Sequence, residues 1–158
     1  MATIRDFLLV GSRFTQFRFN ESIMTRRSDK MDAEVEFNIT TKIGRLPAKV
    51  SDATYDDRPV IEATVRIVAD IVDKPTKPVT KTSSRILLVE FVGGYVGVEN
   101  VFDGDLERFA PLYADFARFL YMAKRDQIED LLENTFLANM PLPEDLAGST
   151  EVAEIGNF

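Results

Sequence analysis

The sequence contains no cysteine, no histidine and no tryptophan among its 158 residues. Without cysteine there are no disulfides or thiolate metal sites, which is compatible with a reducing compartment. Without histidine the usual general base and the common zinc ligand sets are missing. There is no apolar run of membrane-spanning length, and residues 1–6 lack the basic-then-apolar order of a secretion signal. We therefore expect a cytoplasmic protein without membrane insertion.

Basic residues are scarce in the last third of the chain. Residues 1–102 carry 15 basic and 14 acidic side chains, whereas residues 103–158 carry 4 basic and 12 acidic ones. Because phosphate contacts need clustered Lys and Arg, this third disfavours nucleic-acid binding. Solvated helix faces explain the acidic excess most simply, and a partner with a basic surface is the alternative.

The first two thirds of the chain read as strands. Residues 33–39 and 61–72 alternate apolar and polar side chains with period two, which predicts a sheet with one solvated face. No helix-like crossover separates the strands, so antiparallel pairing is expected. The four predicted segments are residues 7–19 (in two pieces, 7–10 and 14–19), 33–39, 61–72 and 86–92.

The fourth predicted strand is apolar except for Glu90, and two glycines follow it directly. An apolar strand of this kind is expected to be covered on both faces. Gly93 and Gly94 then predict a bend, a bulge or the close approach of another backbone.

After residue 105 the apolar spacing changes to three and four, which predicts a long helix ending near residue 134. Asp105 is expected to cap it, and Pro111 to lie in its first turn. The apolar surface is wider than one stripe, so we expect one side to pack on the sheet and the other on a second copy. The interface candidates are Tyr113, Phe116, Phe119, Leu120 and Tyr121.

Catalytic constellations are weak throughout. Asp103, Asp105 and Glu107 offer three carboxylates in five residues, but their spacing is not that of an EF-hand loop, and helix capping explains them better. The glycines near residue 93 lack the Lys-Ser/Thr of a phosphate loop. We therefore predict no enzyme activity, no cofactor and no metal.

Three motifs resemble the SecB family of export chaperones. Residues 88–95, LVEFVGGY, look like the family's fourth strand, with an acidic residue before a glycine and a bulky apolar residue after it. Residues 111–118, PLYADFAR, are similar to the family's PYAR helix segment with two inserted residues. Residues 136–143, FLANMPLP, resemble the segment after that helix. In element order the match covers about residues 3–143.

The resemblance implies an α+β, SecB-like domain at residues 1–143: a four-stranded antiparallel sheet packed against a long C-terminal helix. It further implies a chaperone that holds unfolded or partly folded proteins without ATP and assembles as a dimer of dimers. Its recipient would be a translocase or a toxin–antitoxin component. On this interpretation the client-contacting candidates are Ile43, Leu46, Val50, Tyr55, Met140 and Leu142.

The last 15 residues depart from the family, which has a second C-terminal helix there. Residues 144–158 contain Gly148 and Gly156 and are predicted to be a flexible acidic tail. The alternative function is a non-enzymatic adaptor or structural protein of a mobile element. Such a protein would bind one folded partner through its sheet edge.

Overall fold

The computed structural model describes residues 2–20, 33–46, 58–73, 83–99, 101–133, 135, 142 and 150–154. The side chains of residues 33–36, 46, 71–73, 83, 84 and 150–154 are outside that description. In chain order the elements are η1 (Ile4–Asp6), β1 (Phe7–Phe19), β2 (Ala33–Leu46), β3 (Val60–Asp73), β4 (Ser83–Gly97), η4 (Leu106–Leu112), α2 (Tyr113–Leu132) and β5 (Thr150–Glu154).

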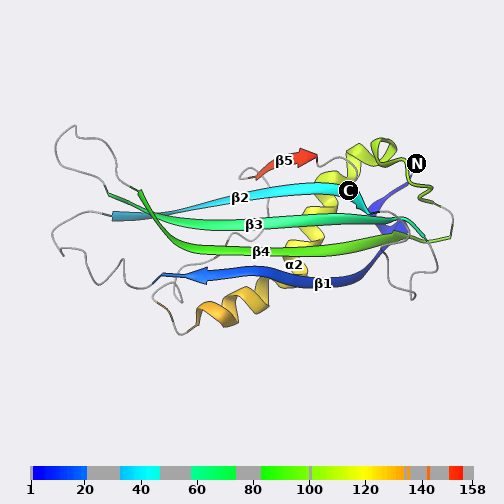
Figure 1. Cartoon of the computed structure of the whole chain (residues 1–158). Coiled ribbons are helices and arrows are strands. Elements are labelled where there is room, and N and C mark those ends of the chain that lie inside the picture. The colour runs from blue at the N-terminus through cyan, green and yellow to red at the C-terminus, as the bar shows by residue number, and fades with distance from the viewer. Residues whose placement is uncertain are drawn as a thin grey trace.

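The strands form one sheet in the order β1-β4-β3-β2-β5. The pairs β1–β4, β4–β3 and β3–β2 are all antiparallel. Four long strands run side by side, and α2 crosses one face of them (Figure 1). The predicted fold class, a four-stranded antiparallel sheet packed against a long C-terminal helix, is confirmed.

β1 is one continuous strand, although the sequence predicts two pieces. Its register against β4 shifts between Leu9 and Gly11 and again between Phe14 and Gln16. Each shift inserts one extra residue, which lets the strand bend without breaking its ladder. The residues around Gly11 that read as a break are thus part of a bulged strand.

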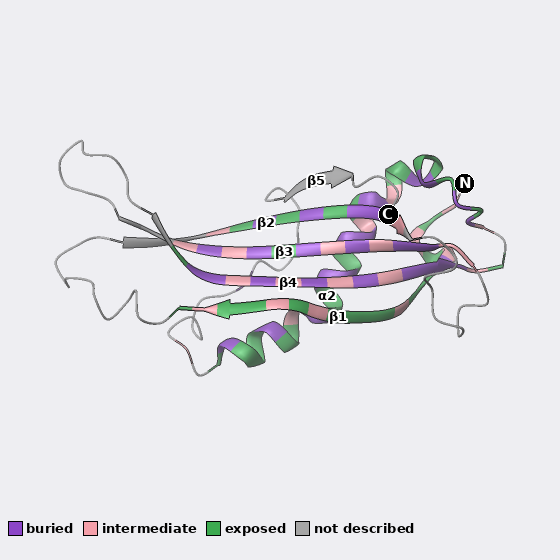
Figure 2. Cartoon of the chain, in the orientation of Figure 1, coloured by how far each residue is buried: buried purple, intermediate pink, exposed green. Residues whose placement is uncertain are grey.

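The core lies between the sheet and α2, on the side of the sheet that we call the helix face. Its central strand, β3, contributes alternate residues that are completely buried, and Figure 2 shows the matching bands of buried residues along β3 and β4. Aromatic rings cross the interface: Phe116 lies edge-on to Phe7, with ring centroids 5.0 Å apart, and Tyr95 donates a hydrogen bond to the Phe116 carbonyl at 2.7 Å. The period-two alternation of β3 therefore predicts its buried side correctly.

Gly93 marks the closest approach of α2 to the sheet. A Cβ atom at this position would lie 2.6 Å from Cδ1 of Leu120, which is closer than packed carbon atoms come. Leu120 is completely buried. The glycine is therefore required for helix packing: what approaches it is a side chain, not another backbone.

The start of the helical region differs from the prediction. Pro111 lies in the 3-10 segment η4, just before α2, where its missing N–H costs no α-helical hydrogen bond. The side chain of Asp105 makes no capping hydrogen bond. Instead the backbone N–H of Asp105 donates to Oδ1 of Asp103 at 3.0 Å. The carboxylate that orders this loop belongs to Asp103, so the prediction of a cap at Asp105 was wrong.

β5 was not predicted. It lies inside the segment expected to be a flexible tail and pairs in parallel with β2. Only five residues long, with two glutamates in its sequence TEVAE, it carries almost none of the apolar alternation that identifies the other strands.

Candidate functional site

The predicted client-contacting residues do not form one surface among the described residues. Ile43 and Leu142 are buried in the core, with 0% and 2% of their surface exposed. Leu46 is the last residue of β2, and its side chain lies outside the description. Val50, Tyr55 and Met140 lie outside the described residues altogether. A client-binding role for these six residues stays a prediction.

The predicted interface residues of α2 mostly pack on the chain's own sheet. Tyr113, Phe116, Leu120 and Tyr121 belong to the core, and only Phe119 is exposed, by 45%. The apolar pattern showed that these side chains are covered but not what covers them. Of the five candidates, Phe119 alone is accessible to a second copy in this conformation.

Among the described residues, the large apolar side chains that are exposed lie on two elements. On β1 they are Leu8, Leu9 and Phe17, and on α2 they are Phe119, Met122 and Leu131. Phe119 and Met122 are three positions apart and so share one side of the helix. Exposed apolar clusters are typical of interaction surfaces, because solvation of such side chains is unfavourable.

β1 is the element that the sequence analysis missed as a candidate site. It pairs with β4 along one side, and no described strand pairs with its other side. Leu9 is level with Tyr95 and Phe17 with Val89, on the helix face, while Leu8 is level with Val96 on the opposite face. Its density of apolar residues on both faces, FLLV and FTQFRF, was the available signal. An uncovered strand edge with apolar side chains can accept another extended chain.

The side of the sheet opposite α2, which we call the polar face, carries charged side chains. A hollow of about 230 Å³ lies there, lined by Thr40, Lys42, Glu62, Thr64, Arg66, Glu90 and Val92. Arg66 pairs with Glu90 at 2.6 Å, and Thr15 donates a hydrogen bond to the same carboxylate at 2.9 Å. The charges of Arg66 and Glu90 therefore compensate each other within the sheet.

The two glutamates of this hollow have shifted pKa values of opposite sign. Burial alone would raise the pKa of Glu90, but hydrogen bonds from Arg66 and Thr15 and the nearby charges of Arg66 and Lys42 bring it below the usual value. Burial raises the pKa of Glu62, and the charge of Arg13 only partly opposes this. Neither carboxylate has a histidine or cysteine partner with which to form a catalytic pair.

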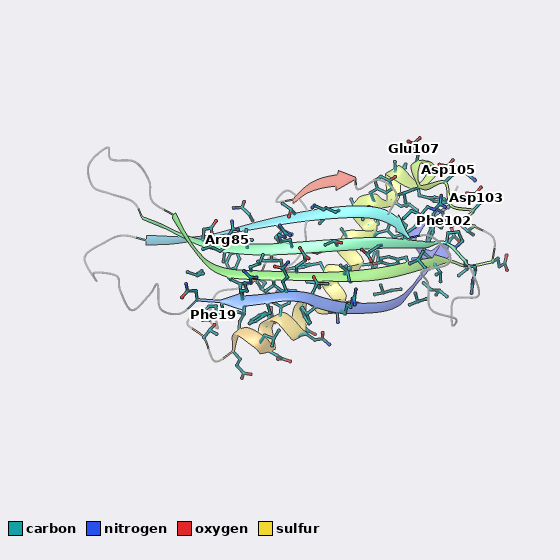
Figure 3. The ribbon with its side chains drawn as sticks, viewed as in Figure 1. Phe19, Arg85, Phe102, Asp103, Asp105 and Glu107 are labelled. Atoms are coloured by element: carbon teal, nitrogen blue, oxygen red, sulfur yellow. The ribbon has the colours of Figure 1, made fainter. Side chains whose placement is uncertain are left out.

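The acidic loop before α2 is organised by arginines. Arg108 pairs with Asp103 at 3.2 Å, and Nη1 of Arg45 donates to the Gly104 carbonyl at 2.7 Å. Figure 3 shows Asp103, Asp105 and Glu107 together at one end of the molecule, remote from Phe19 and Arg85. Within the described part of the chain no cluster of acidic residues has the arrangement of a metal site. None of its helices is long and apolar enough to cross a membrane.

No family model and no curated protein sequence matches the chain. Among solved structures it is similar to the SecB-like chaperone Rv1957 of Mycobacterium tuberculosis, in complex with a ChAD peptide from the Rv1956 HigA1 antitoxin. That likeness covers 88% of this chain and 90% of the other, with 14% identity and a TM-score of 0.37.

Proposed function

We propose that this protein is an ATP-independent chaperone of the holdase type, which binds extended apolar segments of unfolded or partly folded proteins. The observation that carries the proposal is the outer edge of β1, along which no described strand pairs, with the side chains of Leu8, Leu9 and Phe17 exposed on the same strand. Main-chain hydrogen bonds to a strand edge are independent of client sequence, and apolar side chains add affinity. The motif resemblance to SecB supports the same function.

The expected affinity is moderate and the binding releasable. Full burial of one such side chain contributes about 1.5–3 kcal/mol, and these three side chains are already partly buried against their own sheet. Association also has an entropic cost, so only the surplus appears as affinity. A weak, sequence-tolerant site needs no nucleotide hydrolysis for release, and the proposal includes no catalytic step and no cofactor.

Self-association is part of the proposal. Phe119 is the predicted interface residue that is exposed, and Met122 is exposed beside it on the same side of α2. We expect the mass in solution to be that of an oligomer and to fall with Phe119→Glu and Met122→Glu together. In the cytoplasm, clients would be passed to a translocase or would belong to a toxin–antitoxin system.

The test is suppression of client aggregation without ATP. A chemically denatured protein is diluted into buffer with this protein at equal molar ratio, and light scattering is followed. We expect wild type to suppress scattering and Leu9→Asp with Phe17→Asp to need roughly tenfold more protein, a loss of about 1.4 kcal/mol. Ser12→Asp with Arg18→Gln is the matched control, because it changes the same strand by the same net charge at exposed positions.

Two outcomes would contradict the proposal. If wild type suppresses no aggregation and binds no apolar peptide, the chain is not a holdase. If it instead binds one folded partner saturably and ignores unfolded chains, the adaptor function is correct.

A further inference from the structure

The two edges of the sheet differ in what lies beside them. β1 has no described strand on its outer side, whereas β2 is paired in parallel with β5 over Ile39–Ile43. β5 contributes five residues against a strand of 14, and it comes from the C-terminal part of the chain, beyond α2 (Figure 1). The chain therefore places a short strand of its own on an edge that a strand of another protein could use.

The register defines what such a strand should look like. A strand in the place of β5 has three alternate residues level with Ile39, Thr41 and Ile43, all three of which are buried on the helix face. Its other two residues are level with Thr40 and Lys42, which are exposed on the polar face. The best match is a segment with apolar residues at the three alternate positions and an acidic residue level with Lys42.

The sequence of β5 fits this pattern incompletely. Thr150 and Glu154 are level with Ile39 and Ile43, so only Val152 supplies an apolar residue at the three helix-face positions. Ala153, not an acid, is level with Lys42. An extended segment with the full pattern therefore has more to gain on this edge than β5 has.

We propose that the Ile39–Ile43 edge of β2 is an acceptor for an extended strand of a partner polypeptide, and that β5 is an internal occupant which the partner displaces. The inference rests on the proposed function and deepens it, because it names a second edge, the register and the chemistry of the bound segment. β5 also lowers the apparent affinity for a partner, because only the molecules in which β5 has left the edge can bind one.

The first experiment removes the internal occupant. The probe is a fluorescent nine-residue peptide of residues 148–156 that carries T150I, A153E and E154I, and its binding to the full chain is measured by anisotropy. Val152→Pro with Ala153→Pro prevents β5 from pairing, because proline cannot donate to the ladder. If β5 covers the edge in about nine of ten molecules, the peptide should bind about tenfold tighter to this variant. Asn157→Pro, outside β5, is the control and should bind as wild type does.

The second experiment tests the register without touching β5. Lys42 is exposed, so Lys42→Glu should leave the fold intact, which far-UV circular dichroism checks. It should weaken binding of the peptide, and a peptide with A153K in place of A153E should bind the variant better than it binds wild type. Such an exchange of preference requires that the two positions lie side by side.

Equal peptide binding by wild type and the double-proline variant, or no exchange of preference with Lys42→Glu, would overturn the inference. A wild-type dimer that the prolines convert to a monomer would also overturn it, since β5 would then be exchanged between copies. Aggregation suppression is measured on the same samples. If suppression persists, the inference alone has failed; if wild type never suppresses aggregation, the proposed function has failed with it.

Discussion

The helix face and the polar face belong to the same four strands but are built from different side chains. On the helix face β3 contributes Ile61, Ala63, Val65, Ile67 and Ala69, none of which is exposed. On the polar face the same strand contributes Glu62, Thr64 and Arg66, which solvent or opposite charges satisfy. Burial of apolar area stabilises far more than exposed ion pairs do, so the first face should hold the fold and the second should tolerate change.

The contrast also indicates where binding can occur. The helix-face residues of β3 are buried in the core beneath α2, and Arg66 and Glu90 of the polar face bind each other. Within the part of the chain that the structure describes, the surfaces left for a partner are the outer edge of β1, the edge of β2 beside β5, and the exposed side of α2. The binding proposals depend on this difference between the two faces, which substitutions on each face can test.

The largest effect on stability is expected from a charge placed on the buried side of α2. Tyr121 is completely buried, and Tyr121→Glu would bury a carboxylate without a partner, at a cost of about 3–5 kcal/mol. That is a large part of the stability of an ordinary domain. Urea unfolding followed by circular dichroism should show a large loss or no folded state. Phe119→Glu, on the exposed side of the same helix, should change the free energy of unfolding by about 1 kcal/mol or less, and equal losses would contradict the placement of α2.

Overpacking at the closest contact of sheet and helix should come next. Gly93→Val puts a branched side chain where a Cβ atom already lies 2.6 Å from Leu120, and we expect a loss of about 2–3 kcal/mol. Combining it with Leu120→Ala should cost less than the sum of the two single changes, because the shorter side chain makes room. Gly94→Ala, on the polar face, should cost less than Gly93→Val. Additive losses at Gly93 and Leu120 would show that the two residues do not meet.

The polar face should respond to pH in a defined direction. Glu90→Gln removes the carboxylate that Arg66 and Thr15 hold, with an expected loss of about 0.5–1 kcal/mol at neutral pH. Since the folded-state pKa of Glu90 lies below its ordinary value of 4.5, the stabilisation is full above that value and is lost as the pH falls through the folded-state pKa. Urea midpoints of wild type and variant should therefore converge in acid. If the difference between the two urea midpoints does not depend on pH, the charge of Glu90 does not stabilise the fold.

The sequence predicts most of the sheet because alternation directly reports which side of a strand is covered. It could not tell what covers the apolar residues of α2: Leu120 and Phe119 are adjacent in sequence and both apolar, but one is buried and the other 45% exposed. Only the crossing position of the helix, set by Gly93 and Leu120 together, separates them. Lys124 is the opposite case, a charged residue of α2 that is buried: its Nζ lies 5.0 Å from the centre of the Phe14 ring. Because a lysine side chain combines an apolar methylene chain with a terminal charge, its place on the buried or the exposed side of a helix does not follow from its residue type.

The candidate sites were harder to predict than the fold. Period-two alternation identifies neither which strand lies at an edge nor whether that edge is covered, because strand order depends on contacts between distant segments. β1 therefore read as one strand among four, and β5 as a tail. Ile43 and Leu142 were predicted to contact clients because they are apolar, but both belong to the core.

The smallest effect is expected at Glu62, and its sign is opposite to that at Glu90. Burial raises the pKa of Glu62, so the ionised carboxylate costs stability above its folded-state pKa, and the cost disappears as the pH falls through that value. Glu62→Gln should therefore stabilise the fold at neutral pH, by about 0.5 kcal/mol or less. Arg13 opposes the raised pKa of Glu62, so in an Arg13→Gln background the ionised carboxylate costs more and the gain from Glu62→Gln should be larger. The gain in stability is measured by urea midpoints of wild type, Glu62→Gln, Arg13→Gln and the double variant at neutral and acid pH. A loss of stability with Glu62→Gln would show that attraction to Arg13 outweighs the cost of burying Glu62.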